Sequence, residues 1–141
     1  MRTFDSGKSD FKDVGPIQVA RWEQQYQFGT ELPFGAMWYT VPPGASSVRD
    51  CHPEPELSIV VAGAGVVQVA SGNTEVSVGS AFLLDSEEAH VVHNHSTDTP
   101  LTIFSAYWMP LDSASTPADI ATADIATADI ATDHGAEPAG V

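Results

Sequence analysis

The sequence predicts a single all-β domain that closes into a barrel or jelly roll. Three observations carry this prediction. Residues 16–110 break into short runs rich in β-branched and aromatic residues. Turn-forming Pro, Gly, Ser and Asn residues separate these runs. Finally, no stretch of this region carries a sustained apolar repeat of 3.6 residues, which an amphipathic helix requires. Many short strands without helices favour a closed β-architecture.

The expected strands follow one another closely along the chain. In order, they are residues 17–22, 35–41, 56–62, 66–70, 74–78, 81–84, 89–94 and 101–109. We interpret residues 1–15 as a flexible polar arm and residues 16–110 as the folded domain. Residues 111–141 contain three identical copies of Ala-Asp-Ile-Ala-Thr. A period of five matches neither helix nor strand, so we expect a disordered acidic tail.

Composition excludes several classes of partner. The chain has 141 residues, with five lysines and arginines against nineteen acids, for a formal net charge of −14. Such an acidic domain repels nucleic acid and offers no basic clamp for a phosphorylated substrate. We expect no membrane partner, because no stretch approaches the roughly 20 apolar residues of a membrane span. With a single cysteine and no apolar leader segment, a reducing cytoplasm is the expected compartment.

Four side chains have the spacing of a metal site. Asp50, His52 and Glu56 share one parity, so in an extended chain they point to the same face. His90 lies on a later predicted strand. If both faces line the barrel interior, two imidazoles and one or two carboxylates can meet there. Such a mixed set of donors suits Fe(II) first, with Zn(II), Mn(II) or Ni(II) as alternatives.

The glycines around these donors complete two motifs that resemble the cupin superfamily. The first motif runs Gly44, Asp50, His52, Glu56 and Gly63, and the second runs Gly79, His90 and Asn94. The resemblance implies a double-stranded β-helix, that is, a cupin jelly-roll barrel. It covers roughly residues 35–108.

The chain departs from the cupin pattern at three positions. Asp85 and Glu87 replace the expected Pro and Gly of the second motif, and Asp50 replaces the usual first histidine. Three roles are open for Asp50. It is a fourth ligand, or it orients a histidine or acts as a catalytic base, or it marks a site that has lost its metal.

The resemblance implies a metal-dependent enzyme that acts on a small, non-phosphorylated organic molecule. The candidate reactions are those of an oxygenase, or of an isomerase or cyclase of secondary metabolism. The alternative is a metal-free cupin module that binds a small molecule without catalysis. The resemblance also implies a homodimer. We predict that an apolar pocket holds the substrate, with walls formed by Met37, Tyr39, Phe82, Phe104 and Trp108.

Overall fold

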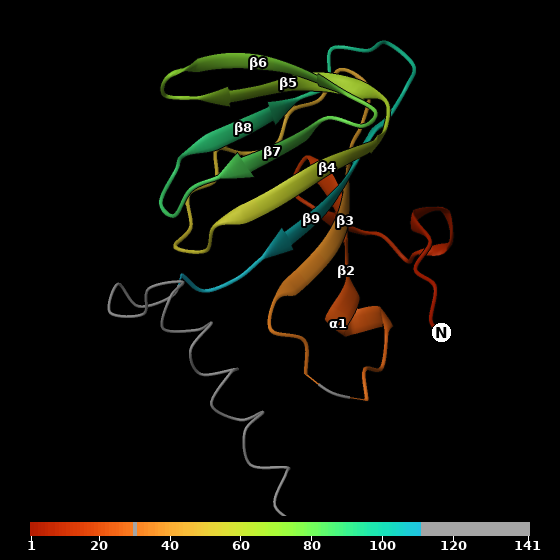
Figure 1. Cartoon of the computed structure of the whole chain (residues 1–141). Helices are drawn as coiled ribbons and strands as arrows, with labels where there is room; N and C mark the ends of the chain where they lie inside the picture. Colours follow the sequence, from red (N-terminus) through yellow and green to blue (C-terminus); the bar gives the residue numbers. More distant parts are fainter. Residues whose placement is uncertain (30, 111–141) are drawn as a thin grey trace, which may run out of the picture. The chain divides into compact units, whose positions relative to one another are not determined.

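Two antiparallel sheets form the domain, as a computed structural model of the chain shows for residues 1–29 and 31–110. The larger sheet has the strand order β1-β2-β3-β9-β4-β7, and the smaller sheet has the order β6-β5-β8 (Figure 1). The strands of this described part are β1 (Lys12–Val14), β2 (Ile17–Arg21), β3 (Gly35–Val41), β4 (Glu56–Ala62), β5 (Ala64–Val69), β6 (Gly72–Ser77), β7 (Ala81–Leu84), β8 (His90–His93) and β9 (Leu101–Tyr107). This arrangement confirms the predicted all-β jelly-roll barrel.

The N-terminal region is more structured than the sequence suggests. Strand β1 pairs with β2, and a short 3-10 turn, η1 (Ser6–Lys8), precedes it. The ring of Phe4 stacks on Trp22 with centroids 4.3 Å apart. Trp22 opens α1 (Trp22–Gln25), where we had expected the preceding strand to continue. Aromatic packing therefore supplies contacts that a polarity pattern does not reveal.

No helix among the described residues is long and apolar enough to cross a membrane. The repeat tail lies outside the described residues.

Apolar side chains from both sheets fill the barrel. Alternate residues of each strand point inward, as the pleat of a β-strand requires. The buried core residues come from strands β2 to β9, and they are Val19, Tyr39, Val41, Val60, Val67, Val76, Leu84, Val92, Leu101 and Ile103. Other buried positions hold polar side chains, and these are Glu56, Ser58, His90, Asn94 and Ser105.

Along strand β4, the pleat separates side chains that face the barrel interior from side chains on the outer surface. Glu56, Ser58 and Val60 are buried on the inner face. Leu57 and Val61, on the outer face, are 37% and 38% exposed. Leu83 of the neighbouring strand β7 is 56% exposed. These apolar residues lie on the face that the expected homodimer would cover, and that assembly stays a prediction.

Two residues of the sequence motifs have structural roles. Gly63 has a φ of +78°, and a Cβ there would overlap the carbonyl oxygen of Pro100, so only glycine fits. The buried amide of Asn94 donates hydrogen bonds to the carbonyl oxygens of Val41 and Thr99. Its Oδ1 accepts from the amide of Ser96. These contacts anchor the loop between β8 and β9.

Glu87 occupies the position where the cupin pattern has glycine. The backbone conformation at this position explains why glycine is preferred there. Its φ is +62°, the left-handed region that residues with a Cβ rarely adopt. Its amide donates to the carbonyl oxygen of His52 over 2.8 Å. The strained residue therefore holds the loop that carries a candidate ligand.

We predict that Glu87→Gly stabilises the domain by about 0.5–1 kcal/mol, because it relieves the left-handed strain. Urea unfolding followed by circular dichroism would measure the change. Glu87→Ala is the matched control, since it removes the same carboxylate but keeps the Cβ. If both variants change stability equally, the carboxylate and not the backbone is responsible.

Candidate metal centre

Three candidate ligands converge at one end of the barrel. Asp50 and His90 form an isolated antiparallel bridge, in which each backbone amide donates to the other residue's carbonyl oxygen. This pairing places both side chains on the same face. His52 follows two residues later, in the loop that leads to β4. One donor atom from each of Asp50, His52 and His90 lies within 4.8 Å of the other two.

Backbone carbonyls orient both imidazole rings. Nδ1 of His52 lies 2.8 Å from the carbonyl oxygen of Glu54, and Nδ1 of His90 lies 2.9 Å from that of Glu88. A carbonyl oxygen only accepts, so in each ring Nδ1 carries the proton and donates it. In the neutral ring, the lone pair is then on Nε2. Metal-binding histidines in proteins are commonly held in this way.

Glu56 lies beside this group, against His52. Its Oε2 is 3.3 Å from Nε2 of His52, while its Oε1 accepts a hydrogen bond from the hydroxyl of Ser58. With the proton on Nδ1, a carboxylate oxygen and an imidazole lone pair face each other. Two acceptors at this distance repel unless a proton or a cation lies between them.

These donors fit a divalent metal ion. Two imidazole nitrogens with one or two carboxylates form a borderline-to-hard set, which accepts Fe(II), Mn(II), Ni(II) or Zn(II). Glu56 and His90 are also buried, 5% and 7% exposed. Interior carboxylates are costly without a positive partner, and an ion between these side chains would supply one. The cluster is thus compatible with a divalent metal, and the chemistry of its donors does not identify which one.

The grouping differs in emphasis from the sequence analysis. The sequence predicts that Asp50, His52, Glu56 and His90 converge, and it leaves the role of Asp50 open. In the structure Asp50 joins the two histidines, and Glu56 is in contact with His52. The physical reason is the backbone bridge between Asp50 and His90, which no spacing along the chain could show.

A cavity of about 270 Å³ opens onto the candidate ligands. It is lined by Arg21, Met37, Asp50, His52, Glu54, Glu56 and Tyr107. A second cavity of about 120 Å³ shares Arg21, Met37, Asp50 and Glu56 with it and adds Tyr39 and His90. Since the two cavities share four residues, we treat them as one interior space, the ligand cavity.

The two tyrosines of this space keep their protons. Burial raises the pKa of Tyr39 strongly, the negative charge of Glu56 raises it further, and a hydrogen bond with Ser58 acts in the opposite direction. Burial also raises the pKa of Tyr107, with a further rise from the charge of Glu23, against the lowering effect of Arg21. Both hydroxyls therefore stay protonated at neutral pH and can donate hydrogen bonds.

The five predicted pocket residues have different surroundings. Met37 and Tyr39 line the ligand cavity. Phe82 packs against the apolar core from β7. Phe104 contacts Trp22 and Trp38, with centroids 5.3 Å from each ring, on the sheet face opposite buried Ser105. Trp108 follows β9, and its amide donates to the carbonyl oxygen of Pro55.

The sequence analysis missed two residues of the site, Arg21 and Ser58. Ser58 has the same parity as Glu56 in a strand whose inner face is buried, so its position could have been inferred. Arg21 has the same parity as Val19, which is buried in the core. A charged residue at the end of a strand, with the same parity as core residues, indicates a side chain that points into the barrel. This pattern could have identified Arg21 from the sequence.

Ser58 and Ser105 allow the environment of Glu56 to be tested. They are register partners on β4 and β9, and both are fully buried. Only Ser58 donates to Glu56, whereas the Ser105 hydroxyl has no hydrogen-bond partner within the described chain. We expect Ser58→Ala to lower the free energy of unfolding by about 1–2 kcal/mol, since a buried acceptor loses its donor.

Ser105→Ala is the matched control and should be neutral or slightly stabilising. Urea unfolding of the two variants at one pH would compare them. Equal destabilisation would mean that the hydroxyl of Ser58 contributes through packing alone.

Comparison with known proteins supports the fold. The plu4264 protein from Photorhabdus luminescens is 22% identical, with 88% of this chain and 97% of that chain covered and a TM-score of 0.65. A cupin 2 conserved barrel domain protein from Salinispora arenicola is 23% identical, covering 81% and 89%, with a TM-score of 0.63. The polyketide cyclase RemF from Streptomyces resistomycificus is 14% identical, covering 76% and 78%, with a TM-score of 0.63. The family model of the cupin domain matches residues 37–107, and the chain therefore belongs to the cupin family.

Proposed function

We propose that this protein is a metal-dependent cupin enzyme that acts on a small, non-phosphorylated organic molecule. One observation carries the proposal: the Nδ1 atoms of His52 and His90 are both fixed by backbone carbonyls, so both rings offer Nε2 beside the carboxylate of Asp50. One donor atom from each of the three residues lies within 4.8 Å of the other two, a spacing that allows them to share an ion. The cavity in front of these atoms provides room for a substrate.

His52, His90 and Asp50 would hold the ion, with Glu56 beside His52. Fe(II) is our preferred ion, because two histidines and a carboxylate are typical of non-haem iron sites with open positions. A bound divalent ion acts as a Lewis acid that polarises a substrate oxygen, and iron in such a site also supports O2 chemistry. Among the solved structures of the same fold, RemF is described as a polyketide cyclase. Both an oxygenase and an isomerase or cyclase are consistent with these donors.

The remaining side chains bind and position the substrate. Glu56 is buried, and its Oε1 is held by Ser58, so its Oε2 stays directed at His52. This carboxylate can accept a substrate proton from within the cavity. The protonated hydroxyl of Tyr39 lies in the same space and makes a hydrogen bond with Ser58. Met37 contributes an apolar wall.

Metal content is the first test. Protein stripped of metal and titrated with Zn(II), Fe(II), Mn(II) or Ni(II) should bind close to one ion per chain, measured by calorimetry and elemental analysis. The double variant His52→Ala/His90→Ala should lose this ion. His93→Ala/His95→Ala is the matched control: it removes two histidines whose rings stack on each other outside the cluster, and it should bind as the wild type does.

Failure of the wild type to bind any of the four metals would overturn the enzyme proposal and favour a metal-free binding module. If the wild type does bind metal, oxygen consumption by the iron-loaded protein with candidate substrates would separate an oxygenase from an isomerase or cyclase.

Asp50 has its own test. We expect Asp50→Asn to weaken Zn(II) binding at least about tenfold, because an amide oxygen replaces a charged ligand. Glu54→Gln is the control, since Glu54 also lines the cavity but meets His52 chiefly through its backbone carbonyl. Its effect should stay within about threefold. Equal losses in both variants would show that Asp50 contributes only through its charge.

A further inference from the structure

We propose that Arg21 binds a carboxylate group of the substrate, so that the protein acts on small organic carboxylic acids. This inference rests on the proposed function and narrows its substrate class. A carboxylic acid falls within the small, non-phosphorylated organic molecules that the sequence predicts as substrates.

Arg21 is directed into the barrel by the pleat of β2. It ends that strand, has the same parity as Val19, and pairs with Met37 of β3. Its side chain lines both parts of the ligand cavity, together with Asp50 and Glu56. Within the described chain, it is the only lysine or arginine among the residues that line this cavity.

The guanidinium of Arg21 is largely without acceptors. Its Nη1 donates to the hydroxyl of Tyr107 over 3.1 Å, the one hydrogen bond that the described residues provide. No carboxylate among them lies within 4.0 Å of it, although the chain carries nineteen acids. A guanidinium has five N–H donors in a planar fork that matches a carboxylate. The free donors therefore face a cavity in which a bidentate anion would satisfy them.

The charges of the cavity decide when an anion can enter. Asp50, Glu54 and Glu56 line it and are opposed by Arg21 alone, so without a metal the space carries an excess of negative charge. A divalent ion together with Arg21 balances these three carboxylates. Only the metal-loaded protein should then accept an added anion without net repulsion.

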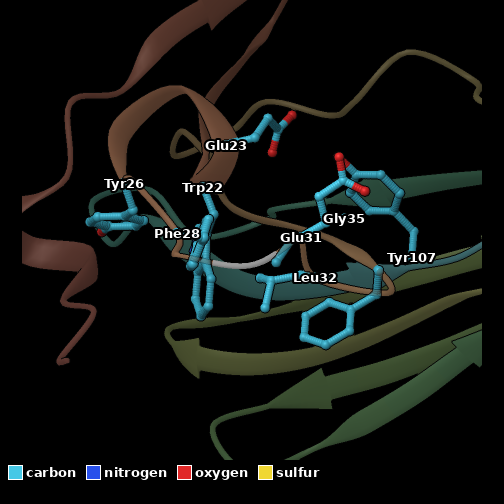
Figure 2. A pocket seen from close by; sticks show the side chains of 10 residues that line it. Trp22, Glu23, Tyr26, Phe28, Glu31, Leu32, Gly35 and Tyr107 are labelled. Carbon is cyan, nitrogen blue, oxygen red and sulfur yellow. The ribbon is translucent and has the colours of Figure 1, made fainter. Parts of the chain in front are cut away.

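Tyr107 separates this cavity from a wider aromatic pocket. Its ring lies where a Cβ of Gly35 would be, so the glycine leaves it room to reach Arg21. Figure 2 shows Tyr107 at one side of the wider pocket, which is lined by Trp22, Tyr26, Phe28 and Leu32 and holds about 550 Å³. The charged residues there are Glu23 and Glu31, which repel anions. The carboxylate end of a substrate is therefore expected on the Arg21 side.

The cavity volume sets the scale of the ligand. The larger part of the ligand cavity holds about 270 Å³, which corresponds to roughly nine water molecules at their liquid volume of about 30 Å³ each. Benzoate is a suitable probe of this size, and benzamide is its neutral analogue of nearly the same shape. Because only benzoate carries a negative charge, a difference in affinity between the two probes reports recognition of the carboxylate and not of the ring.

Calorimetric titration of Zn(II)-loaded protein with the two probes tests the inference. Benzoate should bind and benzamide should bind at least about tenfold more weakly. Arg21→Gln should weaken benzoate binding at least about tenfold, the effect of losing charge-assisted hydrogen bonds. Arg49→Gln is the matched control: Arg49 is exposed and absent from the lining of the cavity, and its variant should bind within about twofold of the wild type. Zinc content is measured for every variant.

A second measurement does not depend on the folding of Arg21→Gln. In the wild type, benzoate but not benzamide should shift the NMR signal of the Arg21 Nε–Hε group, assigned by its absence in Arg21→Lys. Zinc-loaded protein that binds neither probe, binds both equally, or binds benzoate without moving this signal would overturn the inference and leave the metal site intact. Protein that binds no zinc would contradict the proposed function, and with it the charge balance on which this inference depends.

Discussion

The register of the three strands β3, β9 and β4 is the constraint on which the site depends. β9 pairs with both neighbours, and this pairing aligns Gly35, Tyr107 and Glu56 in one row across the sheet. A slip of one residue would turn Glu56 and Ser58 outward and bring Leu57 inward. The apolar residues further along the same strands prevent that slip, since they would leave the core together. The packing of the core therefore fixes the position of the polar groups.

Glu56 and His90 are buried, His52 is half-buried and Asp50 is exposed. The buried members of this polar cluster require partners, and the backbone supplies several of them. Carbonyl oxygens of Glu54 and Glu88 hold the two imidazoles, and the hydroxyl of Ser58 holds Glu56. What remains are acceptor atoms that face one another around a shared point. In a purely structural cluster such an arrangement is unfavourable, whereas around a cation it is stabilising. A cation near Nε2 of His52 and Oε2 of Glu56 would stabilise two acceptor atoms that have no donor between them.

Membership of the cupin family leaves the reaction open, because one fold supports many activities. The differences between members lie in the side chains around the interior space. In this chain, that space holds one arginine with free donors among three carboxylate side chains. This arginine lies outside the segment that matches the cupin family, residues 37–107. The residue that we propose to bind the substrate therefore belongs to β2, which the family pattern does not cover.

The sequence by itself determined the fold class, most strand positions and the identity of the candidate ligands. The bounds of β3, β4 and β7 were predicted to the residue, since alternation and turn residues are local properties of the chain. Parity along β4 also placed Glu56 inside. Local patterns could not show that Phe104 packs against Trp22 and Trp38 or that the N-terminal segment adds β1. The Phe104 contacts join segments far apart in the chain, whereas β1 pairs with its neighbour β2 in a polar segment that carries no strand pattern.

Only the tertiary structure decided how the candidate ligands are grouped. The bridge between Asp50 and His90 joins residues forty positions apart, and the contact of Arg21 with Tyr107 joins residues 86 positions apart. Parity states which face of a strand a side chain occupies, but not which other strand that face meets. The pairing of strands settles the second question, because it depends on how the whole core packs. For this reason the sequence identifies the candidate ligands. It does not reveal that Asp50 pairs with His90, or that Arg21 lines the same cavity.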